Sequence, residues 1–66
     1  MQKRKNLIVW RIINDKTQAE ISKKLGISNG YYSNIERGHV NPSFKILMKF
    51  RDVFEVDDVL ELFKLS

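Results

Sequence analysis

Two asparagines, Asn29 and Asn34, have side chains suited to molecular recognition and stand about one and a half helical turns apart. Each amide offers a hydrogen-bond donor and an acceptor, which is what the edge of an adenine base requires of a partner. Tyr31, between them, can donate to a base or a phosphate or pack on a thymine methyl group. Gly30 costs helix stability and lets a ligand approach the backbone closely. These residue types indicate hydrogen-bond recognition at short range.

Catalytic chemistry is not indicated by any pattern in the chain. Serine, threonine and carboxylate side chains are present, but none form a nucleophile, base and orienting group in a motif of their own. His39 is the single histidine and has no neighbour at metal-ligand spacing, so we expect it to contact phosphate or solvent. With 66 residues there is little room for a pocket. We expect no enzyme activity, no metal, no cofactor and no small-molecule ligand.

The elements that must position the asparagines are two short helices joined by a tight turn. Thr17 and Glu20 have the spacing of a capping box, which predicts that a helix begins at Thr17. Gly26 suits a left-handed C-terminal cap, and Ser28 can cap a second helix two residues later. Gly38 ends that second helix in the same way. The stretch from Thr17 to Gly38 therefore has the layout of a helix-turn-helix.

The first helix is expected over residues 3–14, with Leu7, Trp10 and Asn14 along one face. Its β-branched residues would also suit a strand, and the helical context that follows favours the helix. They make the helix apolar on a second side as well: Ile8, Val9, Ile12 and Ile13. Two explanations remain open, a contact surface for a second chain, or a small domain that covers both sides of this helix.

The remaining core residues are expected at helical spacing. In the second and third helices they are Ala19, Ile21, Ser22, Leu25, Ile27, Tyr32 and Ile35. A fourth helix, capped by Ser43 and running to about Phe54, contributes Phe44, Leu47, Met48, Phe50 and Phe54. A final helix over about residues 57–64, capped by Asp57, contributes Val56, Val59, Leu60 and Phe63. Leu62 and Leu65 fall outside that stripe, which suggests a homodimer contact.

Length and composition favour one small domain spanning residues 1–66, with 42% hydrophobic residues and no cysteine, and the five expected helices make it all-α. The basic and apolar start is interrupted by Arg11, so it is too short for a signal peptide or a membrane span. Lack of cysteine is compatible with a cytoplasmic location. The net charge is +4, and residues 1–33 hold seven basic and two acidic residues, against five and six in residues 34–66. A basic half suits a polyanion such as nucleic acid, although charge alone could also serve solubility.

The segments TQAEISKKLGIS, SNIERG and NPS together resemble the phage repressor and Cro-like helix-turn-helix family, often called XRE. The resemblance covers about residues 7–63. It implies a compact five-helix bundle of lambda-repressor-like type whose third helix, residues 28–37, enters the DNA major groove. The residues that would read bases are Ser28, Asn29, Gly30, Tyr31 and Asn34.

The same resemblance implies two groups of phosphate contacts and one ion pair. Thr17 and Gln18 match the family's contact at the start of the second helix, where free amides and the helix dipole favour an anion. A second group, here called the loop clamp, comprises Arg37, His39, Asn41 and Ser43. Arg11 and Glu36 match a pair that ties the first helix to the third. The chain departs from the family at three positions, Lys16, Arg51 and Tyr32.

Lys16 stands where a leucine is usual and Arg51 where a small core residue is usual, so both side chains are expected to extend their charges to solvent. Tyr32 replaces an isoleucine or valine, and its hydroxyl must find a partner or lie at the protein's edge.

The favoured function is a sequence-specific, dimeric DNA-binding transcriptional regulator, a repressor of phage or mobile-element type in a prokaryotic or phage setting. It would bind double-stranded DNA at a near-palindromic operator as a homodimer. The alternative is a protein-interaction module that kept the helix-turn-helix shape and uses Leu62, Leu65 and the second apolar side of the first helix. Membrane-surface binding is disfavoured, because the core claims Leu7 and Trp10.

Overall fold

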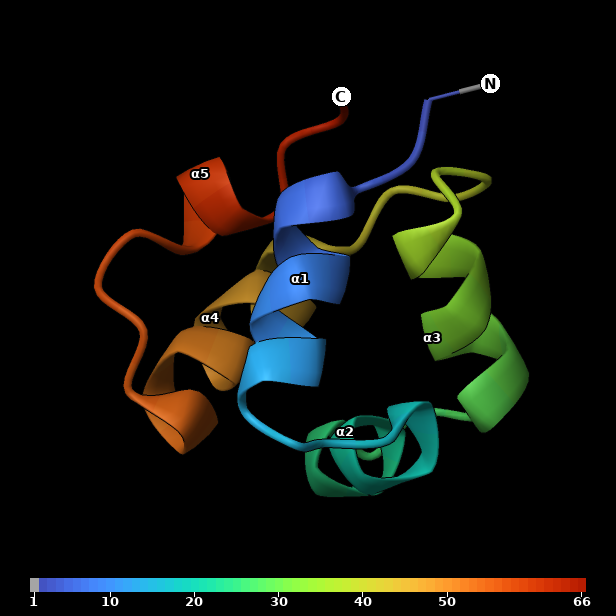
Figure 1. Cartoon of the computed structure of the whole chain (residues 1–66). Coiled ribbons are helices and arrows are strands. Elements are labelled where there is room, and N and C mark those ends of the chain that lie inside the picture. Colours follow the sequence, from blue (N-terminus) through green and yellow to red (C-terminus); the bar gives the residue numbers. More distant parts are fainter. Residues whose placement is uncertain (1) are drawn as a thin grey trace.

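The computed structural model describes residues 2–66 and contains five helices and no strand in that range. They are α1 (Lys5–Ile13), α2 (Gln18–Leu25), α3 (Asn29–Glu36), α4 (Phe44–Phe54) and α5 (Val59–Leu62). The expected all-α, five-helix architecture is confirmed (Figure 1). The first and last helices are shorter than predicted, and α5 makes a single turn rather than spanning residues 57–64. Within residues 2–66, no helix is long and apolar enough to cross a bilayer.

The caps around α2 and α3 form as the sequence predicts. The Thr17 hydroxyl accepts from the Glu20 backbone N–H at 3.1 Å, and the Glu20 carboxylate accepts from the Thr17 N–H at 2.8 Å. That second bond holds the pKa of Glu20 below its ordinary value. Gly26 ends α2 with φ of 73°, and the Ser28 hydroxyl accepts from the Tyr31 N–H at 3.1 Å. Local side-chain chemistry thus sets both ends of the turn.

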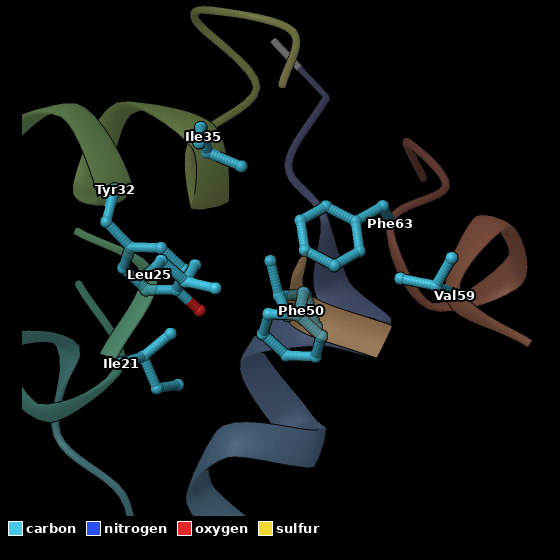
Figure 2. Packing of buried hydrophobic residues seen from close by; sticks show 8 residues of the cluster. Ile21, Leu25, Tyr32, Ile35, Phe50, Val59 and Phe63 are labelled. Atoms are coloured by element: carbon cyan, nitrogen blue, oxygen red, sulfur yellow. The ribbon is translucent and has the colours of Figure 1, made fainter. Parts of the chain in front are cut away.

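The core joins all five helices around Phe50 of α4. Figure 2 shows Ile21, Leu25, Tyr32 and Ile35 on one side of Phe50, with Val59 and Phe63 on the other. The Phe50 ring centroid lies 4.7–5.2 Å from those of Trp10, Phe54 and Phe63. These are tilted or edge-on contacts of the kind that aromatic rings prefer. Leu7 of α1 is also fully buried in this cluster.

Several residues expected in the core are on the surface instead. Phe44 is 73% exposed and Leu60 is 67% exposed, and Ala19 is exposed as well. On α1, the residues Val9, Ile12 and Ile13 are 53%, 60% and 74% exposed. Five short helices enclose one cluster, so each helix buries only its inner face and too little chain remains to cover the rest. The hypothesis that the domain covers both sides of α1 is therefore wrong.

The cap of α5 lies one residue later than predicted. The Asp58 carboxylate, and not that of Asp57, accepts from the Glu61 N–H, at 3.2 Å. The chain leaves α4 through Glu55, whose φ of 53° is left-handed and redirects the backbone before the cap. The position of that bend decides which of the two neighbouring aspartates faces the new helix.

The first described residues, 2–4, and the last, 65–66, pack beside the C-terminal end of α3. The Ser66 N–H donates to the Lys3 carbonyl at 2.8 Å, and the Arg4 N–H donates to the Glu36 carbonyl at 2.9 Å. The Gln2 backbone lies so close to Gly38 that a β-carbon on this glycine would collide with it. In Figure 1 the dark-blue segment that precedes α1 and the red segment that follows α5 lie on the same side of the molecule. The sequence did not indicate this arrangement.

The two basic departures from the family pattern have different surroundings, and only Arg51 is shown to extend to solvent as expected. Lys16 is half-buried, and its ammonium lies 5.6 Å from the centroid of the Phe54 ring. Arg51 is exposed and pairs with Asp52 at 3.1 Å. Neither charge is placed in the core.

Candidate nucleic-acid interface

The start of α3 presents an open polar surface. Asn29 and Gly30 are exposed, and a β-carbon built on Gly30 would meet no other residue within 4 Å. Among residues 2–66, no hydrogen bond occupies the side chain of Asn29 or Asn34. Ser28 uses its hydroxyl oxygen for the cap, which leaves the hydroxyl hydrogen available for donation. Free hydrogen-bond donors and acceptors therefore lie next to the exposed backbone at Gly30.

The residues that the sequence places on the recognition surface become less exposed toward the middle of α3. Asn34 and Ser33 are half-buried, and Tyr31 packs partly against the core cluster. The sequence placed Tyr31 wholly off the packed face, and the structure puts part of its ring on the core. A ring held in this way loses little conformational freedom on binding a ligand.

The C-terminal half of α3 is fixed by a polar network behind it. Arg11 Nε donates to Glu36 Oε2 at 2.7 Å, and Arg11 Nη2 donates to Glu36 Oε1 at 3.3 Å. The expected ion pair is thus present, and only 3% of the Glu36 side chain is exposed. The hydrogen bonds to Glu36 raise the pKa of Arg11. Gln18 Nε2 also donates to Glu36 Oε1, at 3.0 Å, so one carboxylate connects α1, α2 and α3.

Tyr32 fills the space beneath α3 without a partner for its hydroxyl. The residue is fully buried, and its oxygen has no hydrogen bond within residues 2–66. The alternative that this hydroxyl lies at the protein's edge is wrong, because the residue is fully buried. Burial raises the pKa of Tyr32, and the nearby Glu36 carboxylate adds to the effect. The ring contributes packing, and the hydroxyl contributes a desolvation cost.

The candidate phosphate contacts lie at two separate places. Thr17 and Gln18 are at the start of α2, where Gln18 is half-buried by its bond to Glu36. The loop clamp lies in the segment that joins α3 to α4 (Figure 1). All four of its members are exposed: Arg37, His39, Asn41 and Ser43. The Ser43 hydroxyl also caps α4, accepting from the Ile46 N–H at 3.2 Å.

One residue of this region escaped the sequence interpretation. Arg4 is only 4% exposed, and its guanidinium bonds to the Ile35 carbonyl and to the Asn41 side chain. Its neighbours Lys3 and Lys5 are exposed, as a basic chain start suggests. No pattern in the sequence distinguishes Arg4 from them.

The leucines proposed for dimer contact differ in exposure. Leu62 is half-buried against the core, whereas Leu65 is 38% exposed. Within residues 2–66, no cluster of His, Cys, Asp or Glu side chains could hold a metal ion.

Comparisons with known proteins agree with this geometry. The sequence profile of a family described as helix-turn-helix matches residues 10–59, which include α2 and α3. An uncharacterised HTH-type transcriptional regulator of Methanocaldococcus jannaschii is 36% identical over 47 residues, which cover 71% of this chain and 71% of that protein. No solved structure matches the chain significantly. The chain belongs to the phage repressor and Cro-like helix-turn-helix family.

Proposed function

We propose that this chain is a transcriptional regulator that binds double-stranded DNA and reads bases in the major groove with α3. The observation that carries the proposal is the contrast across this helix. Asn29 and Gly30 are exposed with free hydrogen-bonding groups, while Tyr32, Ile35 and Glu36 on the other side are buried. A helix that is held in place by its buried face and exposes polar groups at its N-terminal end can enter a groove without a change in the protein's conformation. The similarity to an HTH-type transcriptional regulator supports the same function.

The phosphate contacts we propose flank the reading helix. Gln18 Nε2 carries two hydrogens, of which one is donated to Glu36 and the other remains for a phosphate. The free amides at the start of α2 add to this contact, because a helix N-terminus favours an anion. In the loop that follows α3, the loop clamp supplies a guanidinium, an imidazole, an amide and a hydroxyl. Such contacts fix the orientation of a protein on DNA without selecting the sequence.

The finer parts of the proposal concern assembly and biological setting. Two copies would place their α3 helices roughly 34 Å apart, about one DNA turn, on a near-palindromic operator. Leu62 and Leu65 remain our proposed dimer contact, and Leu65 is the more exposed of the two. We propose a repressor of phage or mobile-element type, acting in a prokaryotic cytoplasm.

Selection of bound duplexes from a random DNA pool tests this function most directly. We expect enrichment of a two-fold symmetric site, because a symmetric dimer presents two identical reading helices. Enrichment of a single half-site would contradict the dimer but not the DNA reading. Failure to enrich any sequence, together with no binding at low salt, would contradict the function itself.

A protein-interaction module is the second candidate, because α1 exposes Val9, Ile12 and Ile13. Clustered apolar side chains on a helix surface are typical of contact sites for other proteins. A gel shift on the DNA that flanks the chain's own gene separates the two functions. Binding at low salt favours the regulator, and its absence favours the interaction module.

A further inference from the structure

Arg4 is buried in an unusual environment for a cation. Its Nη1 donates to the Ile35 carbonyl at 3.3 Å, and its Nη2 donates to Asn41 Oδ1 at 2.9 Å. Within residues 2–66 no carboxylate forms an ion pair with it, and its Nε–H has no hydrogen-bond partner. Arg4 is therefore a desolvated charge whose side-chain partners are two uncharged oxygens.

Fold stability does not explain this choice of residue. A buried charge without a counter-ion is costly, and an apolar side chain of similar length would fill the same space at lower cost. The guanidinium is better explained by its effect on the groups that it contacts. One of these, the Ile35 carbonyl, is in the last turn of α3 and also accepts from the Gly38 backbone N–H at 3.1 Å. The other, Asn41, belongs to the loop clamp.

The contact fixes which way the Asn41 amide faces. A guanidinium carries only donors, so the Asn41 atom that meets it must be the amide oxygen. The NH₂ group is on the other branch of the same planar amide and therefore does not face Arg4. Since Asn41 is exposed, its NH₂ group is left as a donor at the surface of the loop clamp.

We propose that Arg4 is a positioning residue for DNA backbone binding: it holds Asn41 with its NH₂ donor directed toward a phosphate. The same guanidinium connects the end of α3 to the loop, so the reading helix and the loop clamp keep one spacing. Lysine cannot replace it, because an ammonium lacks the planar fork that bonds two acceptors in fixed directions. This inference rests on the DNA-binding function proposed above.

A double-mutant cycle tests the role of Arg4. Arg4→Met, Asn41→Ala and the double variant are compared with the unmodified chain on a selected duplex and on an unrelated duplex, at one salt concentration. We expect each single variant to weaken binding to both duplexes by roughly three- to tenfold, the effect of one hydrogen bond. The double variant should bind no more weakly than Arg4→Met, because Asn41 without Arg4 no longer makes its contact. Arg51→Met, which removes an exposed arginine, is the matched charge control.

Two results would overturn the role of Arg4 while leaving the function intact. One is that Arg4→Met binds like the Arg51→Met control, and the other is that the Arg4 and Asn41 effects multiply. If the unmodified chain binds no duplex even at low salt, the proposed function and this role of Arg4 fail together.

A measurement without DNA keeps the inference testable if Arg4→Met does not fold. NMR relaxation of the Asn41 side-chain NH₂ should show an ordered amide in the unmodified chain and a mobile one in Arg4→Lys, which keeps the charge. Equal order in both would overturn the proposal.

Discussion

The two sides of α3 differ in how their side chains are held. On the inner side, Glu36 accepts hydrogen bonds from Arg11 and Gln18, and Ile35 is fully buried. On the outer side, Asn29 is exposed and Gly30 faces open space. The inner side therefore determines where the helix lies, and Asn29 on the outer side makes no side-chain hydrogen bond within residues 2–66. Substitutions on the inner side should change stability, and replacement of Asn29 should change DNA recognition with little effect on stability.

Glu36→Ala should have the largest effect. It leaves the Arg11 guanidinium without its carboxylate partner and releases Gln18, so we expect a loss of about 3 kcal/mol in the free energy of unfolding. Urea unfolding followed by Trp10 fluorescence measures this, since Trp10 packs on Phe50 and Phe54. Replacing both Arg11 and Glu36 by methionine should cost far less. An equal loss in the double variant would show that the ion pair is not the cause.

Asn29→Ala should leave stability within about 0.5 kcal/mol, because the side chain is exposed. It should reduce discrimination at one base pair by about 1–3 kcal/mol. Binding to a panel of operators with single base changes measures the loss. As a control, Gln18→Ala should weaken binding to every member of the panel alike. Uniform weakening by Asn29→Ala as well would remove Asn29 from the base-reading group.

Tyr32→Phe should stabilise the domain by about 1 kcal/mol, because it removes a buried hydroxyl that has no partner in residues 2–66. The raised pKa of Tyr32 means that the folded state resists its ionisation. Its contribution to stability is therefore complete below the ordinary tyrosine value of 10.0 and is lost as pH rises above it. The urea midpoint of Tyr32→Phe should be higher than that of the unmodified chain at neutral pH. At alkaline pH the midpoint should fall less for Tyr32→Phe than for the unmodified chain. A destabilised variant would reveal a hydrogen bond to the hydroxyl.

Glu20→Gln should have the smallest effect and lies outside α3. The pKa of Glu20 is lowered, so its stabilising contribution is present above the ordinary value of 4.5 and is lost as pH falls below it. The neutral amide can still accept from the Thr17 N–H, so the cap should persist with little dependence on pH. Melting temperatures between pH 6 and 3 should therefore fall less steeply for Glu20→Gln. Identical slopes would assign the acid sensitivity to other carboxylates.

The sequence was most informative where one side chain determines local structure. Thr17, Gly26 and Ser28 act on backbone groups within three or four residues, so their roles could be inferred without knowing the fold. The Arg11–Glu36 pair spans 25 residues and could be expected only through the family resemblance. Resemblance also gave the overall architecture.

The sequence was least informative where a role depends on what other segments cover. Helical spacing places Phe44 and Leu60 on apolar stripes, yet both lie beyond the reach of neighbouring helices. Arg4 is the reverse case, since it is a basic residue near the start of the chain and yet is buried. The loop that covers it contains Asn41, 37 residues away in the sequence. Burial in so small a domain depends on chain geometry that periodicity does not contain.

The empty space around Gly30 has a consequence for how this protein can evolve. A β-carbon introduced there would meet no neighbour within 4 Å, and replacing the glycine with alanine would improve helix propensity by up to about 1 kcal/mol. Most mutations that alter function lower stability, but substitutions at this position should not. Under the proposed function, we expect position 30 to accept new side chains that change operator preference without loss of folding, which makes it a starting point for a randomised library.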